Sequence, residues 1–177
     1  IFFIIFTACV NKKDDKLFSK LSNRESGVYF SNDLSYDDDF NIFTYRNYFN
    51  GGGVGVIDIN NDNLLDIYLT SNLNSNKLYL NLGDMKFKDI TDEAGVGGTK
   101  SWSTGVSIAD VNADGFLDIY VCNSGDIEGD NKQNELFINN GDQTFTEMAK
   151  EFGLDDMGFS THAAFFDYDK DGDLDMY

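Results

Sequence analysis

Short apolar runs, separated by polar and glycine-containing turns, make up most of the chain after residue 50. At the start of this region the runs are rich in Val, Ile, Tyr and Phe and are bounded by Gly, Asn and Asp. Runs of this length and composition indicate β-strands rather than helices. We expect four strands at residues 53–57, 66–70, 77–81 and 87–90, followed by a helical turn that ends at Gly95.

The same pattern recurs along the chain. Residues 78–96 (LYLNLGDMKFKDITDEAGV) align without a gap with residues 136–154 (LFINNGDQTFTEMAKEFGL), and WSTGVSIAD, from Trp102, aligns with FSTHAAFFD, from Phe159. Units of about 50 residues with four strands each are typical of β-propeller blades. The sequence therefore predicts an all-β fold, a partial β-propeller whose blades contain four antiparallel strands.

The first strand of each unit is rich in small residues. In a propeller this strand lies next to the axis, where blades crowd together and small side chains fit best. At the position that Gly53 and Gly105 occupy, the third unit has His162, the only histidine. A ligand contact in the channel and a structural role are both open for His162. The small residues are Gly53, Gly55, Gly105, Ser107, Ala163 and Ala164.

The repeats divide the chain into segments. We expect blade 1 at residues 51–100, blade 2 at 101–156 and the start of blade 3 at 157–177. Two complete repeats and part of a third do not close a ring that needs about four to eight blades, so we expect a piece of a longer protein. Residues 17–50, which include GVYFSN and NIFTYRNYF, are expected to form strands that complete a missing last blade. A small separate cap is the alternative.

The N-terminal segment has the features of an export signal. Residues 1–9 form an apolar run that is too short to span a bilayer and suits the core of a secretory signal. Thr7 and Ala8 before Cys9 resemble the lipobox of bacterial lipoproteins, in which the cysteine is lipidated; an incidental cysteine is the alternative. The polar linker at residues 10–16 contains KKDDK, which resembles the tag of surface-exposed lipoproteins in Bacteroidetes. We therefore expect secretion across the inner membrane and an outer-membrane or cell-surface lipoprotein, with membrane contact only through a lipid anchor.

Composition excludes some classes of function. The chain has 177 residues, with 13 Lys and Arg against 31 Asp and Glu and a formal net charge of −18. Hydrophobic residues make up 41%, enough for a packed core, so the charge does not indicate disorder. Nucleic acid is excluded as a partner because phosphate binding needs clustered Lys and Arg. Cys9 and Cys122 lie far apart and do not suggest a disulfide framework.

Eleven of the 31 acidic residues fall in three loops of one pattern, D-x-[DN]-x-D-[GN]-x-x-D. The loops are DINNDNLLD from Asp58, DVNADGFLD from Asp110 and DYDKDGDLD from Asp167. Calcium takes six to eight oxygen ligands in a flexible arrangement. Side chains at loop positions 1, 3, 5 and 9, with a backbone carbonyl at position 7, supply that number. The pattern therefore predicts a calcium-binding hairpin.

The residue at position 6 must turn the loop sharply. Gly115 and Gly172 allow the positive φ that such a turn requires, and Asn63 tolerates it better than most residues. An EF-hand does not fit, because its glutamate at position 12 is replaced by Leu69 in the first loop and Val121 in the second. Each loop also leads into an alternating strand pattern instead of a helix.

The hairpin within a repeat, with NxLYxNxGxxxFxDxT downstream, resembles the FG-GAP/VCBS-type repeat of integrin-like propellers. STHAAFFDYDKDGDLDMY and CNSGDIEGDN resemble bacterial surface proteins that pair such repeats with a C-terminal ASPIC/UnbV domain. The resemblance covers residues 51–177 and implies a seven-bladed or similar propeller with calcium in its hairpins. The ligands that it implies are the side chains of Asp58, Asn60, Asp62, Asp66, Asp110, Asn112, Asp114, Asp118, Asp167, Asp169, Asp171 and Asp175, with the carbonyls of Leu64, Phe116 and Asp173.

Two acidic segments lie outside these loops. Residues 37–39 (DDD) are expected to be a solvated loop. Residues 123–134 (NSGDIEGDNKQN) form a longer connection than their counterpart at residues 71–76 (SNLNSN). Insertions on one face of a propeller often bind partners, although simple decoration is the alternative.

Three functions are compatible with the sequence. The first is a non-catalytic, calcium-binding module at the cell surface that binds an extracellular protein or glycan. The second is the propeller part of a secreted enzyme, such as one that acts on polysaccharides with paired carboxylates. The chain has one histidine, and the sequence shows no catalytic triad or dyad of the Ser-His-Asp or Cys-His kind around it. The aspartates are better explained as metal ligands than as catalytic residues. The third is a scaffold for a domain encoded beyond residue 177.

Overall fold

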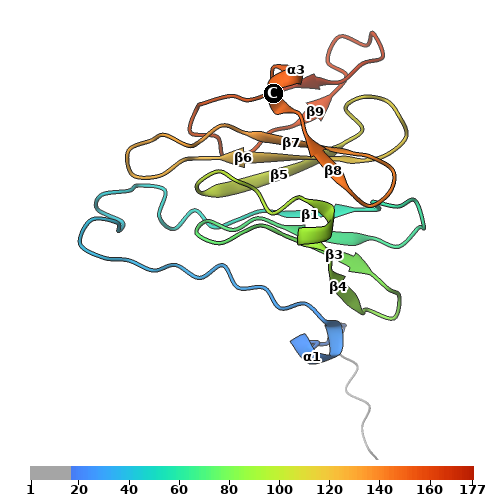
Figure 1. Ribbon diagram of the computed structural model, residues 1–177, viewed down its shortest axis with the longest axis horizontal. Helices are drawn as coiled ribbons and strands as arrows, with labels where there is room; N and C mark the ends of the chain where they lie inside the picture. Colours follow the sequence, from blue (N-terminus) through green and yellow to red (C-terminus); the bar gives the residue numbers. More distant parts are fainter. Residues whose placement is uncertain (1–16) are drawn as a thin grey trace, which may run out of the picture.

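The computed structural model describes residues 17–177, so the expected export signal, Cys9 and the polar linker lie outside the described residues. Two four-stranded antiparallel sheets stack on each other, and a two-stranded hairpin follows them (Figure 1). Within residues 17–177, every helix is too short and too polar to cross a membrane. The prediction of an all-β fold with propeller-type blades is confirmed.

Each sheet follows the chain from one edge to the other, as propeller blades do. Blade 1 consists of β1 (Val54–Ile57), β2 (Asp66–Leu69), β3 (Lys77–Asn81) and β4 (Phe87–Asp89). Blade 2 consists of β5 (Ser103–Ala109), β6 (Asp118–Asn123), β7 (Glu135–Asn139) and β8 (Phe145–Glu147). The final hairpin pairs β9 (Phe165–Phe166) with β10 (Asp175–Met176).

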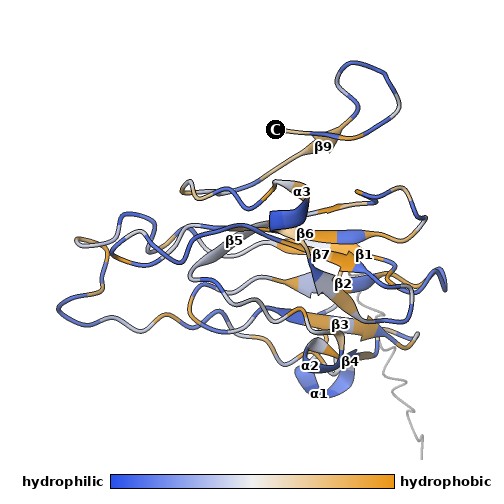
Figure 2. Cartoon of the chain, turned by 45° about the horizontal axis from the view of Figure 1, so that its top comes forward, coloured by the Kyte–Doolittle hydropathy of each residue, from blue (hydrophilic) through white to orange (hydrophobic). Residues whose placement is uncertain are grey.

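The main core lies between the two blades. Residues from both sheets are buried there, among them Ile57 and Tyr68 of blade 1 and Ile119 and Phe137 of blade 2. Figure 2 shows the hydrophobic residues concentrated in the stacked strands, whereas the short helices are hydrophilic. A second cluster joins blade 2 to Ala163 ahead of the final hairpin. The stacking of blades therefore buries the apolar runs of the sequence, and β6 and β7 are buried along their whole length.

Small residues allow the first strands to approach each other. A methyl group on Gly53 would lie 2.8 Å from the carbonyl oxygen of Thr104, and one on Gly105 would collide with the carbonyl of Thr161. The amide of Gly105 donates a hydrogen bond to that same carbonyl over 2.9 Å. The expected crowding between the first strands of neighbouring units is thus present. His162 is exposed.

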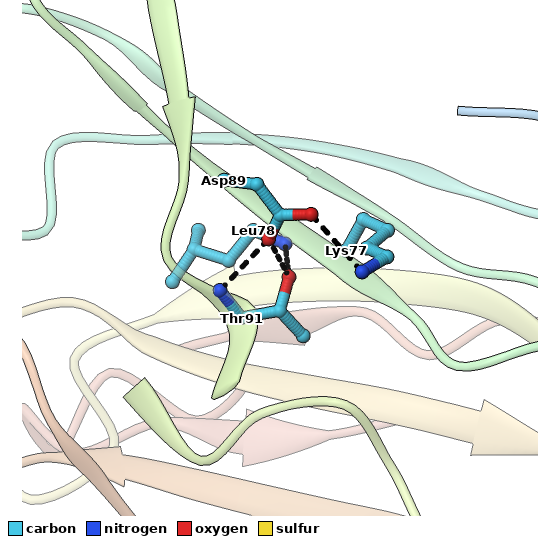
Figure 3. A network of polar contacts seen from close by, with 4 residues as sticks. All are labelled: Lys77, Leu78, Asp89 and Thr91. Atoms are coloured by element: carbon cyan, nitrogen blue, oxygen red, sulfur yellow. Dashed lines mark hydrogen bonds and ion pairs between the residues drawn. The ribbon is translucent and has the colours of Figure 1, made fainter. Parts of the chain in front are cut away.

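A helical turn follows the last strand of each blade, as expected. These turns are α2 (Thr91–Ala94) and α3 (Ala149–Phe152), and the glycine after each adopts a left-handed conformation. The first turn is held by a polar network (Figure 3): the Thr91 hydroxyl donates to Asp89 over 2.6 Å and accepts from the Leu78 amide over 2.9 Å. Asp89 also pairs with Lys77 over 3.0 Å.

Residues 17–50 differ from the expectation of strands. They contain one short helix, α1 (Asn23–Ser26), and turns, but no strand. Their aromatic rings pack together on Trp102 instead of lying along a strand, and Tyr45 donates its hydroxyl to the carbonyls of Ser124 and Gly125. The prediction of strands in this segment is wrong, because side chains rather than a backbone ladder attach it to the blades. Its role in completing a last blade stays a prediction.

Candidate metal centre in the acidic loops

The three acidic loops each connect the first two strands of a unit, at residues 58–66, 110–118 and 167–175. The strand pairs Ile57–Asp66, Ala109–Asp118 and Phe166–Asp175 close them. All three lie at one end of the stack, on the right in Figure 1, and residues 36–50 lie at the other end. Positions 1 to 9 below count from the first aspartate of each loop.

The aspartate at position 1 organises each loop by accepting backbone N–H groups from positions 5 and 6. Carboxylate oxygens on these amides hold the loop in a tight curve. In the third loop, the aspartate at position 1 accepts the N–H of position 6. The bonds join Asp58 to Asp62 (3.1 Å) and Asn63 (2.8 Å), Asp110 to Asp114 (3.0 Å) and Gly115 (2.9 Å), and Asp167 to Gly172 (3.3 Å).

The side chain at position 5 accepts the N–H of position 7. In the first two loops the amides of Leu64 and Phe116 donate over 2.8 Å, to Asp62 and Asp114 respectively. In the third loop, the amide and side chain of Asp173 lower the pKa of Asp171 by hydrogen bonding, and the pKa of Asp173 is raised by the same partner. A ligand role for the position-7 carbonyls stays a prediction.

The aspartate at position 9 ties the loop to the sheet. Asp66 and Asp118 are buried, and each accepts one N–H from position 2 of its loop and one from the third strand. The third-strand donors are Asn81, over 2.7 Å, and Asn139, over 2.9 Å. Burial, more than the nearby loop carboxylates, raises the pKa of both aspartates above its usual value. In the third loop the donor to Asp175 is the amide of Tyr168, over 2.8 Å.

Two backbone positions in each loop have positive φ. Position 6 behaves as the sequence predicts, with φ of 66° at Asn63, 90° at Gly115 and 98° at Gly172. Position 4 has the same feature, which sequence reasoning missed. The residues there are Asn61 (57°), Ala113 (57°) and Lys170 (66°), and only Asn61 belongs to a type that favours this conformation.

The remaining oxygen atoms fit a hard cation. In the third loop, one oxygen from each of Asp167, Asp169 and Asp175 lies within 4.8 Å of the others. In the first loop, the Oδ1 atom of Asn60 is buried and has no hydrogen-bond partner within residues 17–177. Buried polar atoms of proteins are nearly always paired, so this oxygen suits a ligand. In the second loop the corresponding oxygen, Oδ1 of Asn112, accepts the N–H of Asp114 over 3.1 Å, and the Asn112 side chain donates to Asp114 over 2.8 Å. An all-oxygen set of this kind favours calcium or magnesium over zinc.

An asparagine on the third strand of each blade holds the acidic loop in place, although the sequence analysis gave these asparagines no role. The Asn81 side chain donates to the carbonyl of Leu65 over 2.8 Å. The Asn139 side chain donates to the carbonyl of Leu117 in its own loop and, over 2.9 Å, to that of Ile59 in the loop of blade 1. Both residues are the first residue of an NxG motif. The recurrence of this motif in the two repeats could have identified them from the sequence.

Comparison with known proteins agrees with this geometry. Residues 58–121 and 123–177 match the sequence profile described as the FG-GAP-like repeat. The chain belongs to the FG-GAP-like repeat family. It is also 29% identical over 160 residues to Cartilage acidic protein 1 from Xenopus tropicalis, an alignment that covers 88% of this chain. The chain spans only 23% of the length of that relative.

Proposed function

We propose that this FG-GAP repeat chain is a calcium-stabilised, non-catalytic module that binds an extracellular protein or glycan at the cell surface. Membership of the family supports a propeller-like binding module. The observation that carries the calcium assignment is the buried, unpartnered Oδ1 atom of Asn60, at a predicted ligand position of a loop whose geometry recurs twice. The same proposal includes lipidation of Cys9. It also includes a C-terminal domain of the ASPIC/UnbV type in the full protein.

Calcium suits these loops better than magnesium does. Calcium takes six to eight oxygens in a flexible arrangement, whereas magnesium demands a near-ideal octahedron and retains several waters. The loops offer oxygens on a curved backbone, with Asn or Gly at the sharp turn of position 6. The hydrogen bonds at positions 1 and 9 fix the orientation of the aspartates at these positions, which supports their role as ligands.

Titration calorimetry of the full chain against CaCl₂, MgCl₂ and ZnCl₂ tests this assignment. We expect calcium to bind more tightly than magnesium, with a dissociation constant of about 10⁻⁴ to 10⁻³ M, as for other extracellular modules. Asp62→Asn should weaken binding at the first loop, because it removes a charge from a ligand position. Asp84→Asn, an exposed change in the β3–β4 turn, is the matched control. A preference for zinc over calcium would rule the assignment out.

A further inference from the structure

A second acidic surface lies at the end of the blades opposite the metal loops. It is formed by residues 36–49 and by the long β6–β7 connection, which both lie on the left in Figure 1. Its carboxylates belong to Asp37, Asp38, Asp39, Asp126 and Glu128. We call it the acidic–aromatic surface, because exposed aromatic rings lie among these carboxylates.

Two hollows of about 360 Å³ each adjoin at Asp37 on this surface. The first contains Tyr36, Phe43 and Phe49, whose exposed fractions are 80%, 94% and 70%. The second runs between residues 37–40 and residues 126–128, with Phe40 and Ile127 among its walls. Each hollow is therefore lined both by apolar side chains and by carboxylates, which we call its carboxylate rim.

A buried group in the first hollow is left without a partner. Tyr48 lines this hollow, and its side chain is only 2% exposed. Its hydroxyl is buried and has no hydrogen-bond partner within the described part of the chain. An unpaired buried hydroxyl is costly, so the polar groups beneath this hollow are not fully satisfied within residues 17–177.

The carboxylates of the acidic–aromatic surface have no cationic partner among the described residues, although Asp37 and Asp126 accept backbone N–H groups of their own loops. Among residues 17–177, none of its five carboxylates forms an ion pair. The nearby Lys132 points its ammonium group at the ring of Phe159, 3.9 Å from the ring centre. That contact shows how a cation binds over an aromatic face at this end of the molecule. The carboxylates are spread along two hollows instead of converging on one point, which suits an extended cation better than a metal ion.

We propose that the acidic–aromatic surface binds a basic segment of a partner protein, with Lys or Arg side chains over Phe43 and Tyr36 and their charges against the carboxylate rim. This inference rests on the proposed binding function and names the class of its partner. Charge complementarity supports it, since the chain has a net charge of −18. The long β6–β7 connection, with no counterpart of that length in blade 1, supplies Asp126 and Glu128.

The test is fluorescence anisotropy of the full chain in 1 mM CaCl₂ and 150 mM NaCl. The probe is a labelled eight-residue peptide in which Lys and Arg alternate with Gly and Ser, and its neutral analogue carries acetyl-lysine and citrulline. We expect the basic peptide to bind and the neutral analogue not to bind. A combined Asp38→Asn, Asp39→Asn and Glu128→Gln variant should lower the affinity about tenfold. Phe43→Ser should lower it about threefold through the lost cation–π contact.

The matched control removes three exposed carboxylates elsewhere, by Asp84→Asn, Asp92→Asn and Glu151→Gln. It should retain the affinity within about twofold. An equal loss in both triple variants would show attraction to net charge alone and would overturn the proposal. Equal binding of the neutral peptide would also overturn the proposal. A third contrary outcome is binding of a neutral glycan that Phe43→Ser abolishes and that the surface triple variant leaves intact.

Melting curves of the same samples with and without EDTA separate this proposal from the calcium assignment. If EDTA leaves the melting temperature unchanged while the surface triple variant loses the peptide, the calcium assignment fails and the docking surface stands. If EDTA lowers the melting temperature and the basic peptide does not bind at all, the docking surface is wrong and the calcium module stands.

Discussion

The side-chain amide of Asn139, in blade 2, donates a 2.9 Å hydrogen bond to the carbonyl of Ile59, in the acidic loop of blade 1. Both residues are buried. A second bond between loops runs from the side chain of Asn61 to the carbonyl of Gly115 over 3.2 Å. The acidic loop of blade 1 is therefore coupled to blade 2, and a metal bound in this loop should stabilise the packing of both blades.

Removal of the Asn139 side chain should destabilise the protein by about 1–3 kcal/mol, because it leaves the buried Ile59 carbonyl unsatisfied. Chemical denaturation of Asn139→Ala measures this loss. The neighbouring Asn140 is exposed and bonds within its own turn, so Asn140→Ala should cost no more than about 0.5 kcal/mol. Equal stability losses in the two variants would show that the bond between blades contributes nothing.

Calcium removal should lower the stability of the folded chain. If about 1 mM calcium exceeds the dissociation constant tenfold, each site contributes roughly 1.4 kcal/mol, and three sites contribute about 4 kcal/mol. That is a large share of the 5–15 kcal/mol that typically holds a domain together. EDTA should therefore lower the melting temperature and increase protease cleavage in the loops. Asp114→Ala should reproduce part of the effect, and excess magnesium should restore less stability than calcium does. Melting that is indifferent to calcium would remove the structural metal sites.

The strained position 4 of the second loop offers a gain in stability. Ala113 has a φ of 57°, a conformation that costs an ordinary residue about 1 kcal/mol, and Asn61 has the same φ in the first loop. Ala113→Asn should raise the free energy of unfolding by about 0.5–1 kcal/mol. The reverse exchange, Asn61→Ala, should lower it, also because it loses the bond to Gly115. Urea denaturation of the two variants measures both changes, and a destabilised Ala113→Asn would show that the loop is not strained there.

Local patterns in the sequence were enough to predict the blades. Short runs of strand-forming residues and the Gly, Asn and Asp residues between them marked the four strands of each blade, and small residues marked where β5 approaches its neighbours. The glycine of position 6 likewise follows from local backbone geometry. These features recur in each repeat, so the pattern of one repeat supports the prediction for the next.

Long-range side-chain contacts could not be predicted in the same way. Tyr45 contacts Trp102 and residues 124–125, far along the chain, and no periodicity in residues 17–50 indicates such contacts. Asp66 is a predicted ligand, and it also accepts backbone N–H groups. This second role depends on the third strand, which lies beside the loop only after folding. The positive φ of Ala113 was hidden because alanine gives no signal for it.

Lipidation of Cys9 can be tested in cells independently of the fold. Cys9 follows Thr7 and Ala8 as in a lipobox, so metabolic labelling with palmitate should mark the protein. Cys9→Ala should abolish the label and release the protein into a soluble fraction, whereas Cys122→Ala should retain both the label and the membrane fraction. Unchanged membrane association of Cys9→Ala would contradict the lipid anchor.

The buried Glu135 should make stability depend on pH. It is 1% exposed, and its carboxylate accepts the amide and hydroxyl of Thr99 over 2.8 and 2.9 Å. Burial raises its pKa above the ordinary value of 4.5, against the opposing effect of these hydrogen bonds. A carboxyl group with a raised pKa in the folded state binds its proton more tightly there than in the unfolded chain. Its contribution to stability is therefore fully present below pH 4.5 and is lost as the pH rises through the folded-state pKa.

Glu135→Gln removes this titration and keeps an oxygen for Thr99. The difference in melting temperature between the variant and the wild type should therefore shift in favour of the variant as the pH rises from about 4 to 7, because only the wild type must then bury a charge. Differential scanning calorimetry across this range measures the difference. The exposed Glu151→Gln, which also replaces one carboxylate by an amide, is the control for the exchange itself. Parallel curves for Glu135→Gln and wild type would show that Glu135 titrates alike in the folded and unfolded states, and that burial of its carboxylate has no cost.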